Sequence, residues 1–156
     1  MKKLQVLIGG TEPVFCDVAK AAQQFWGCEV MTVPDGKQAC ALLRTRHVDI
    51  CILDWDLPRM TGLAACHWIR SVELKTSPYI VLLTEKARPE QVRAAYLAGA
   101  NDYVAKPFSM EDLHFLVSTF AQRVSRRDVP AHEPRHIDLL ELYRQDLAAP
   151  KIYSRL

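Results

Sequence analysis

The chain has 156 residues, of which 49% are hydrophobic and 24% are charged, and its formal net charge is +2. This composition is typical of a folded globular protein and excludes a disordered chain, while the length fits one α/β domain with a short extension. A net charge so close to zero gives no reason to expect attraction to nucleic acid or to a membrane surface.

The amino terminus and the cysteines indicate a cytoplasmic protein. The first apolar run covers only residues 4–8, which is too short for a signal-peptide core or a membrane span. No two cysteines form a C-x-x-C pair, and all of them lie among apolar residues, so we expect reduced thiols in a core and no metal or redox site. The cysteines are Cys16, Cys28, Cys40, Cys51 and Cys66.

Short apolar runs alternate along the chain with longer segments of helical period. The predicted strands cover residues 4–8, 29–33, 49–53, 79–83 and 102–104. The predicted helices cover residues 13–26, 36–44, 62–71, 89–98 and 110–125. This alternation predicts an α/β protein of three layers, a flavodoxin-like doubly wound parallel sheet with strand order 2-1-3-4-5.

Several helix boundaries carry residues suited to capping. Asp35 and Thr61 can accept hydrogen bonds from first-turn amides, and Gly99 can end a helix in the left-handed conformation. Ser109 and Asp112 form a predicted capping box at the start of the last helix of this series. These residues support the predicted ends of the helices.

The composition changes after residue 125, where charged residues and two prolines indicate an exposed linker. We therefore expect a domain over residues 1–125, followed by a linker and short helical extension over residues 126–156. Within that extension, apolar residues can line one side of a short helix from about residue 135 to 148. They are Ile137, Leu140, Tyr143 and Leu147.

Three reactive side chains follow three different predicted strands. Asp54 comes after the third strand, Thr84 after the fourth and Lys106 after the fifth. Because ligands bind at the carboxyl ends of the strands in open α/β sheets, an acid, a hydroxyl and an ammonium would converge on one point. That set suits a transferred phosphoryl group with an anionic acceptor.

Three segments resemble the response-regulator receiver domains of two-component signalling. The first, DICILDWDLPRMTG over residues 49–62, is similar to the phosphoacceptor segment of that family. The other two agree in order and spacing: PYIVLLT over residues 78–84 and AGANDYVAKPF over residues 98–108. The resemblance covers roughly residues 4–125.

The resemblance implies a role for each matching residue. Asp54 would accept the phosphoryl group, Lys106 would bind one of its oxygens, and Thr84 would move toward it as a switch residue. Tyr103 would be the aromatic switch that reports the state. The backbone of Asp56 would join Asp54 in holding a metal ion, and the peptide bond that follows Lys106 would be cis.

The implied function is signalling by protein–protein interaction in a two-component system or phosphorelay, and not enzymatic activity. The implied partners are a histidine kinase or phosphotransfer protein, a downstream effector, or both. A homodimer could form through the face made by the fourth helix, fifth strand and fifth helix, or through the C-terminal helix. Neither direct nucleic-acid binding nor membrane association is expected.

The sequence departs from the family where a metal ion should bind. Receivers usually carry two acidic residues after the first strand, whereas Gly10 and Thr11 occupy those positions here. Glu12 could substitute only if the loop shifts, so we expect weak Mg²⁺ binding. Glu85 adds a carboxylate at the entrance, which would repel a phosphoryl donor.

These departures favour a degenerate receiver. Asp54 and Lys106 could form a direct ion pair that needs neither metal nor phosphate. This reading predicts phosphorylation-independent signalling, while phosphorylation of Asp54 stays open as the second mode.

Two further alternatives remain. One is a flavodoxin-like small-molecule-binding protein or enzyme, although the loop over residues 9–13 does not continue as a glycine-rich phosphate loop. The other is that the domain is the regulatory part of a longer polypeptide with its own output domain.

Overall fold

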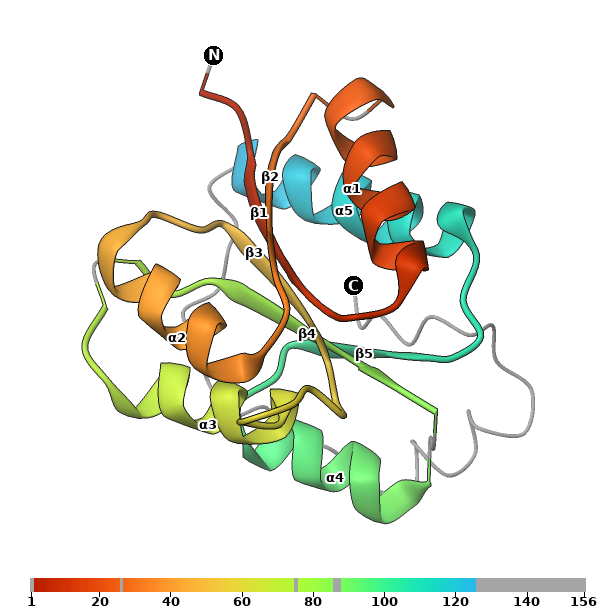
Figure 1. Cartoon of the computed structure of the whole chain (residues 1–156). Coiled ribbons are helices and arrows are strands. Elements are labelled where there is room, and N and C mark those ends of the chain that lie inside the picture. The colour runs from red at the N-terminus through yellow and green to blue at the C-terminus, as the bar shows by residue number, and fades with distance from the viewer. Residues whose placement is uncertain (1, 26, 75, 86–87, 126–156) are drawn as a thin grey trace.

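Strands and helices alternate along the chain (Figure 1). The computed structural model describes residues 2–25, 27–74, 76–85 and 88–125, and within these ranges it contains five strands and five α-helices. The strands are β1 (Gln5–Gly9), β2 (Glu29–Val33), β3 (Ile50–Asp54), β4 (Tyr79–Thr84) and β5 (Asp102–Ala105). The helices are α1 (Pro13–Phe25), α2 (Gly36–Thr45), α3 (Gly62–Ser71), α4 (Pro89–Leu97) and α5 (Met110–Ser125).

The sheet is parallel throughout and has the order β2-β1-β3-β4-β5, which confirms the predicted topology. The predicted ends of the strands were wrong by one residue at several places. Asp54 and Thr84 are the last residues of β3 and β4, where they pair with Leu83 and Ala105. The ladder continues into these polar residues because strand pairing uses backbone groups, whatever the polarity of the side chain.

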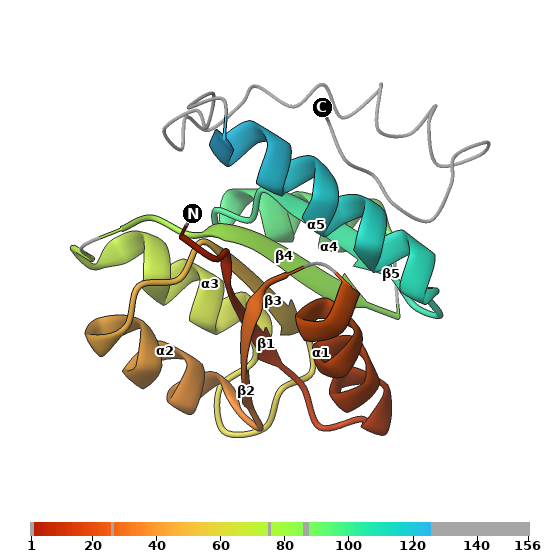
Figure 2. The same ribbon diagram turned by 90° about the horizontal axis from the view of Figure 1, so that it is seen from above.

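Two helical layers cover the sheet (Figures 1 and 2). Helices α1 and α5 lie on one face, and α2, α3 and α4 lie on the other. Side chains along each strand alternate between the two layers, as the period of a strand requires. For example, Val6 and Ile8 belong to the hydrophobic cluster beneath α1 and α5, whereas Leu7 belongs to the cluster beneath the other three helices.

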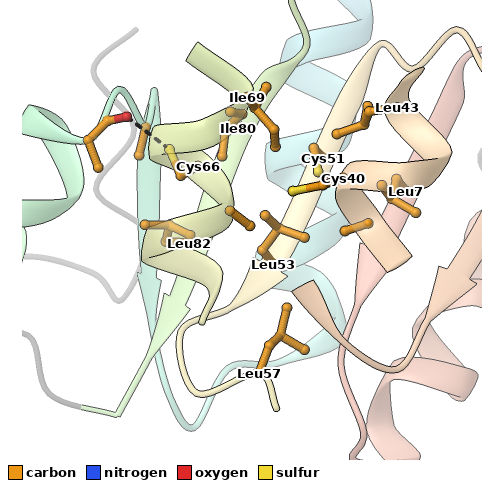
Figure 3. Close-up of a cluster of buried hydrophobic side chains, with 14 of the residues drawn as sticks. Leu7, Cys40, Leu43, Cys51, Leu53, Leu57, Cys66, Ile69, Ile80 and Leu82 are labelled. Atoms are coloured by element: carbon orange, nitrogen blue, oxygen red, sulfur yellow. Dashed lines mark hydrogen bonds between the residues drawn. The ribbon is translucent and has the colours of Figure 1, made fainter. Parts of the chain in front are cut away.

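Three thiols lie in the larger of these clusters (Figure 3). Cys40, Cys51 and Cys66 are buried among aliphatic side chains, and the Cys66 thiol donates a hydrogen bond of 3.5 Å to the carbonyl oxygen of Ala98. Burial raises the pKa of the Cys40 thiol to about 11 and that of Cys66 to about 12. These buried thiols are therefore protonated at neutral pH, and a protonated thiol is a poor nucleophile and metal ligand.

One of the cysteine predictions was wrong. Cys16 is exposed on α1, because the helix turns this position away from the sheet, whereas Cys28, like the three thiols above, is buried. Within the described ranges, no group of three or more histidine, cysteine or acidic side chains could hold a metal ion.

The predicted caps are present. Asp35 and Thr61 accept hydrogen bonds from the amides of Gln38 and Ala64, at 2.8 and 3.1 Å. The capping box of α5 is reciprocal: the Ser109 amide donates to Asp112 Oδ2 at 2.9 Å, and the Asp112 amide donates to Ser109 Oγ at 3.1 Å. Gly99 follows α4 with a φ of 101°, the left-handed conformation expected of it.

The predicted linker and helical extension over residues 126–156 lie outside the described residues. In the part of the chain that the structure does describe, no helix is long and apolar enough to cross a membrane.

Candidate functional site

Three strand ends bring the predicted site residues together at one edge of the sheet. Asp54 ends β3 and Thr84 ends β4, while Lys106 directly follows β5. The Lys106 amide donates to the carbonyl oxygen of Thr84 at 2.8 Å, and the Lys106 side chain reaches Asp54. The side chains of Asp54 and Lys106 therefore meet as the sequence predicted, because parallel strands end at a common edge.

The Lys106 ammonium lies between two carboxylates. Lys106 Nζ is 2.8 Å from Asp54 Oδ2 and 2.7 Å from Glu12 Oε1. The Lys106 and Asp54 side chains are only 11% and 8% exposed, whereas Glu12 is 48% exposed. The direct ion pair between Asp54 and Lys106 that the sequence suggested is present. Glu12 also lies in the site, as a second partner of Lys106.

The two carboxylates decide the charge state of the lysine. Burial alone would lower the pKa of Lys106, because it disfavours the charged form. The hydrogen bonds and opposite charges of Asp54 and Glu12 outweigh burial, so the pKa of Lys106 lies above its ordinary value. The ammonium therefore remains protonated at neutral pH and supplies a fixed positive charge inside the site.

The loop after β3 holds the other oxygen of Asp54. The amide of Asp56 donates to Asp54 Oδ1 at 3.1 Å, while the Asp56 side chain itself is exposed. A Cβ at Gly62 would lie 2.2 Å from the carbonyl oxygen of Asp54, so only glycine lets the start of α3 approach the strand end this closely. Both carboxylate oxygens of Asp54 thus have partners within the protein.

The loop after β1 contributes no carboxylate where the family usually has two. The Gly10 amide donates to the carbonyl oxygen of Val33 at 3.1 Å, and Thr11 is exposed. Beyond them, Phe15 is buried at 2% exposure, and its ring centroid lies 5.9 Å from Lys106 Nζ. An aromatic ring therefore borders the lysine on the side of α1.

The remaining candidate residues lie around this centre. Tyr103 is 2% exposed and packs edge-on against Tyr96, with ring centroids 6.1 Å apart. Glu85 is exposed beyond the end of β4. The Lys106–Pro107 peptide bond is cis, as the resemblance implied.

A family model for the response regulator receiver domain matches residues 6–118. The chain belongs to this family. The receiver domain is accordingly a module of two-component signalling, and the strand order and the helices of the fold agree with that assignment.

Relatives with established names support the assignment. The probable transcriptional regulatory protein TcrX of Mycobacterium tuberculosis is 39% identical over 108 residues, which cover 69% of this chain and 45% of that protein. The chemotaxis protein CheY of Pseudomonas aeruginosa is 34% identical over 92 residues, or 58% of this chain and 73% of that protein. This receiver domain spans about half the length of most curated relatives it matches.

Solved receiver structures have the same fold. The chemotaxis response regulator CheY4 of Vibrio cholerae superposes with a TM-score of 0.69 at 26% identity, covering 76% of this chain and 99% of that one. The receiver domain of the sensor histidine kinase PA1611 from Pseudomonas aeruginosa PAO1 gives a TM-score of 0.67 at 29% identity, covering 78% and 99%. That second structure contains a magnesium ion coordinated in its active-site cleft.

Receiver domains generally bind Mg²⁺ in this cleft, but the residues of this chain do not fit the ion. Mg²⁺ requires several oxygen ligands in near-octahedral geometry and is usually bound through carboxylates. Positions 10 and 11 supply none, and the carboxylates of Asp54 and Glu12 are both engaged by the Lys106 ammonium. A divalent cation would have to displace a cation that belongs to the chain.

Two features of the site were missed from the sequence. The pairing of Glu12 with Lys106 depends on the direction of a loop, which residue type alone does not give. Phe15 was taken only as part of a helix, and its contact with the site follows from the packing of α1 on the sheet. A glycine followed five residues later by a large aromatic residue was the available signal, and it is too common to identify such a contact.

Proposed function

We propose that this receiver domain signals through protein–protein contacts in a form that requires neither Mg²⁺ nor a phosphoryl group at Asp54. The observation that carries this proposal is the position of Lys106 Nζ, at 2.8 Å from Asp54 and 2.7 Å from Glu12. A phosphoryl-transfer site needs positive charge, which is usually supplied by a metal ion. Here Lys106 supplies it, and its ammonium neutralises the acceptor carboxylate of Asp54 itself.

Phosphoryl transfer to Asp54 should be slow for electrostatic reasons. Metal ions neutralise the charge that develops on a transferred phosphoryl group, and this pocket lacks the carboxylates to hold one. Glu12 and Glu85 add negative charge near the entrance. An anionic phosphodonor would therefore meet repulsion with no divalent cation to offset it.

A second candidate is a phosphoaccepting receiver, and the retained trio of Asp54, Thr84 and Lys106 favours it. In that mode Asp54 accepts the phosphoryl group, Lys106 binds one of its oxygens and Thr84 supplies the hydroxyl that moves toward it. Tyr103 acts as the aromatic switch, and the backbone of Asp56 assists a weakly held metal ion. The ion pair of Asp54 and Lys106 would have to open first.

The partners proposed for either mode are proteins. A histidine kinase or phosphotransfer protein would act upstream and an effector protein downstream, with no direct binding of nucleic acid and no membrane contact. A homodimer through α4, β5 and α5 or through the C-terminal extension is compatible with both modes. We place the receiver domain at residues 1–125 of a cytoplasmic protein, without enzymatic activity of its own.

Intact-mass measurement after incubation with acetyl phosphate and Mg²⁺ separates the two modes. The proposal predicts no mass gain by the wild-type chain under conditions that phosphorylate a receiver domain with the usual acidic pair, which serves as the positive control. A gain of one phosphoryl group per chain that disappears in the Asp54→Asn variant would reject the phosphorylation-independent function in favour of the second candidate.

A further inference from the structure

The Phe15 ring lies where a side chain at position 10 would have to project. A Cβ built on Gly10 would be 2.2, 2.3 and 2.7 Å from three carbon atoms of that ring. Cβ atoms do not approach other heavy atoms this closely, so any residue larger than glycine requires the ring to move. A substituent at position 10 and an aromatic ring at position 15 therefore compete for one volume.

The ring has little freedom to move aside. Phe15 is 2% exposed and belongs to the hydrophobic cluster beneath α1 and α5. It packs against Phe108, with ring centroids 6.2 Å apart and planes tilted by 44°. Since protein interiors are close-packed, displacing the ring would disturb the neighbours in that cluster.

The same ring faces the lysine of the site. Lys106 Nζ lies 5.9 Å from the ring centroid, within the range of a cation–π interaction, while Asp54 and Glu12 contact the ammonium through oxygen atoms. Two carboxylates and one aromatic ring thus surround the ammonium of a lysine side chain that is 11% exposed. The two carboxylates and the ring all attract a positive charge, and the Lys106 ammonium supplies it.

We propose that Phe15 is the positioning residue that keeps this pocket in its metal-independent form. The ring excludes an acidic side chain from position 10 and stabilises the Lys106 ammonium between the two carboxylates. Metal affinity then cannot be regained by restoring the acidic pair alone, because the residues at positions 10 and 15 are coupled. This inference rests on the proposed function and adds the residue responsible for it.

Isothermal titration with MgCl₂ alone tests the coupling directly. One variant carries Gly10→Asp and Thr11→Asp, and a second carries the same pair together with Phe15→Val. We expect the second variant to bind Mg²⁺ at least tenfold more tightly than the first, with no saturable binding by the wild type or by Phe15→Val alone. Equal affinities of the two variants would overturn the inference.

A stability measurement keeps the inference testable if the acidic variants fail to fold. Gly10→Ala introduces only the Cβ, so it should lower the melting temperature by about 5 °C or more in the wild-type chain. In the Phe15→Val background, Gly10→Ala should lower the melting temperature by less than half of that amount. As a matched control, Phe115→Val replaces an aromatic side chain that is 51% exposed on α5 and should leave the cost of Gly10→Ala unchanged. Equal costs in the wild-type and Phe15→Val backgrounds would contradict the coupling.

The two proposals fail in distinguishable ways. A phosphoryl mass gain by the wild-type chain would reject the phosphorylation-independent function, while the coupling between positions 10 and 15 could still be measured. Equal Mg²⁺ affinities with and without Phe15→Val would reject the role of Phe15, while the absence of phosphorylation in the wild type would still support the proposed function.

Discussion

Among single residues, Lys106 has the largest effect on the charge balance of the site, because it pairs with two carboxylates. Its ammonium is paired with a buried carboxylate, Asp54, and with a half-exposed one, Glu12. An ion pair at the protein surface contributes little to stability, because water and salt screen it. Removing one member of a buried pair is costly, because the other charge is left without compensation.

The Lys106→Met substitution should therefore destabilise the fold by about 3 kcal/mol, as expected when a buried carboxylate loses its counter-charge. The free energy of unfolding measured in urea checks this value. Lys20→Met, on the exposed side of α1, is the matched control and should change stability by less than about 0.5 kcal/mol. A loss at Lys106 no larger than the control would mean that the ion pair does not hold the pocket.

The sequence predicted the members of the site better than it predicted their interactions. Asp54, Thr84 and Lys106 could be placed together because parallel strands end at a common edge. The pairing of Glu12 with Lys106 and the contact of Phe15 with position 10 could not be placed in the same way. Both depend on loop direction and helix packing, which are tertiary properties with no local signal.

At the scale of elements, polar side chains cap the first turns of α2, α3 and α5 and so fix where these three helices begin. Asp35 is buried at 4% exposure, and besides the Gln38 amide it accepts from the side-chain amide of that residue at 3.1 Å. Capping at this position sets the start of α2, the helix that packs beside α3. The capping residues could be predicted from the sequence because a cap depends only on the side chain at the helix start and on the nearby amides.

The Asp35→Ala substitution should cost about 1 to 2 kcal/mol, because it leaves a first-turn amide of α2 without an acceptor. Thermal unfolding followed by circular dichroism provides the measurement. Asp35→Asn keeps an acceptor oxygen in place and should recover most of the loss. If the asparagine variant were as unstable as the alanine variant, the negative charge would matter and not the cap.

Helix and strand ends were the least predictable part of the elements. The ends of β3 and β4 lie one residue beyond the apolar runs, at Asp54 and Thr84. Polarity suggested that each strand had ended before these residues, whereas the backbone ladder continues through them. The difference places both side chains on the rigid sheet and not in a loop, which gives the site a defined geometry.

At the scale of the whole molecule, the thiols make the stability of the fold sensitive to alkaline pH. Burial raises the pKa of Cys40 from 9.0 to about 11 and that of Cys66 to about 12. Above pH 9 the unfolded chain would release protons that the folded chain retains, so stability falls as the pH rises. Lys106 affects stability in the same direction but at higher pH. Because its pKa is raised above 10.5, the contribution of its ion pairs to stability is lost only above pH 10.5.

Unfolding free energies measured from pH 7 to pH 10.5 should be constant at first and then decrease above about pH 9. Cys66→Ala should reduce the slope of this decrease, because it removes one of the buried thiols that stay protonated. Ile80→Val, at a buried position without a titratable group, should lower stability but leave the slope unchanged. A stability that stays constant to pH 10.5 would contradict the assignment of neutral buried thiols.

A lysine of the chain takes the place of a metal ion beside Asp54, and this substitution can be checked by titrating the wild-type protein with MgCl₂ and following its amide NMR spectrum. The amide of Asp56 donates to Asp54, and the amide of Lys106 lies beside the end of β4, so both should report a bound ion. Because Lys106 already occupies the position of the cation, neither resonance should shift in a saturable way up to about 10 mM Mg²⁺. Saturable shifts of both resonances at lower concentration would contradict it.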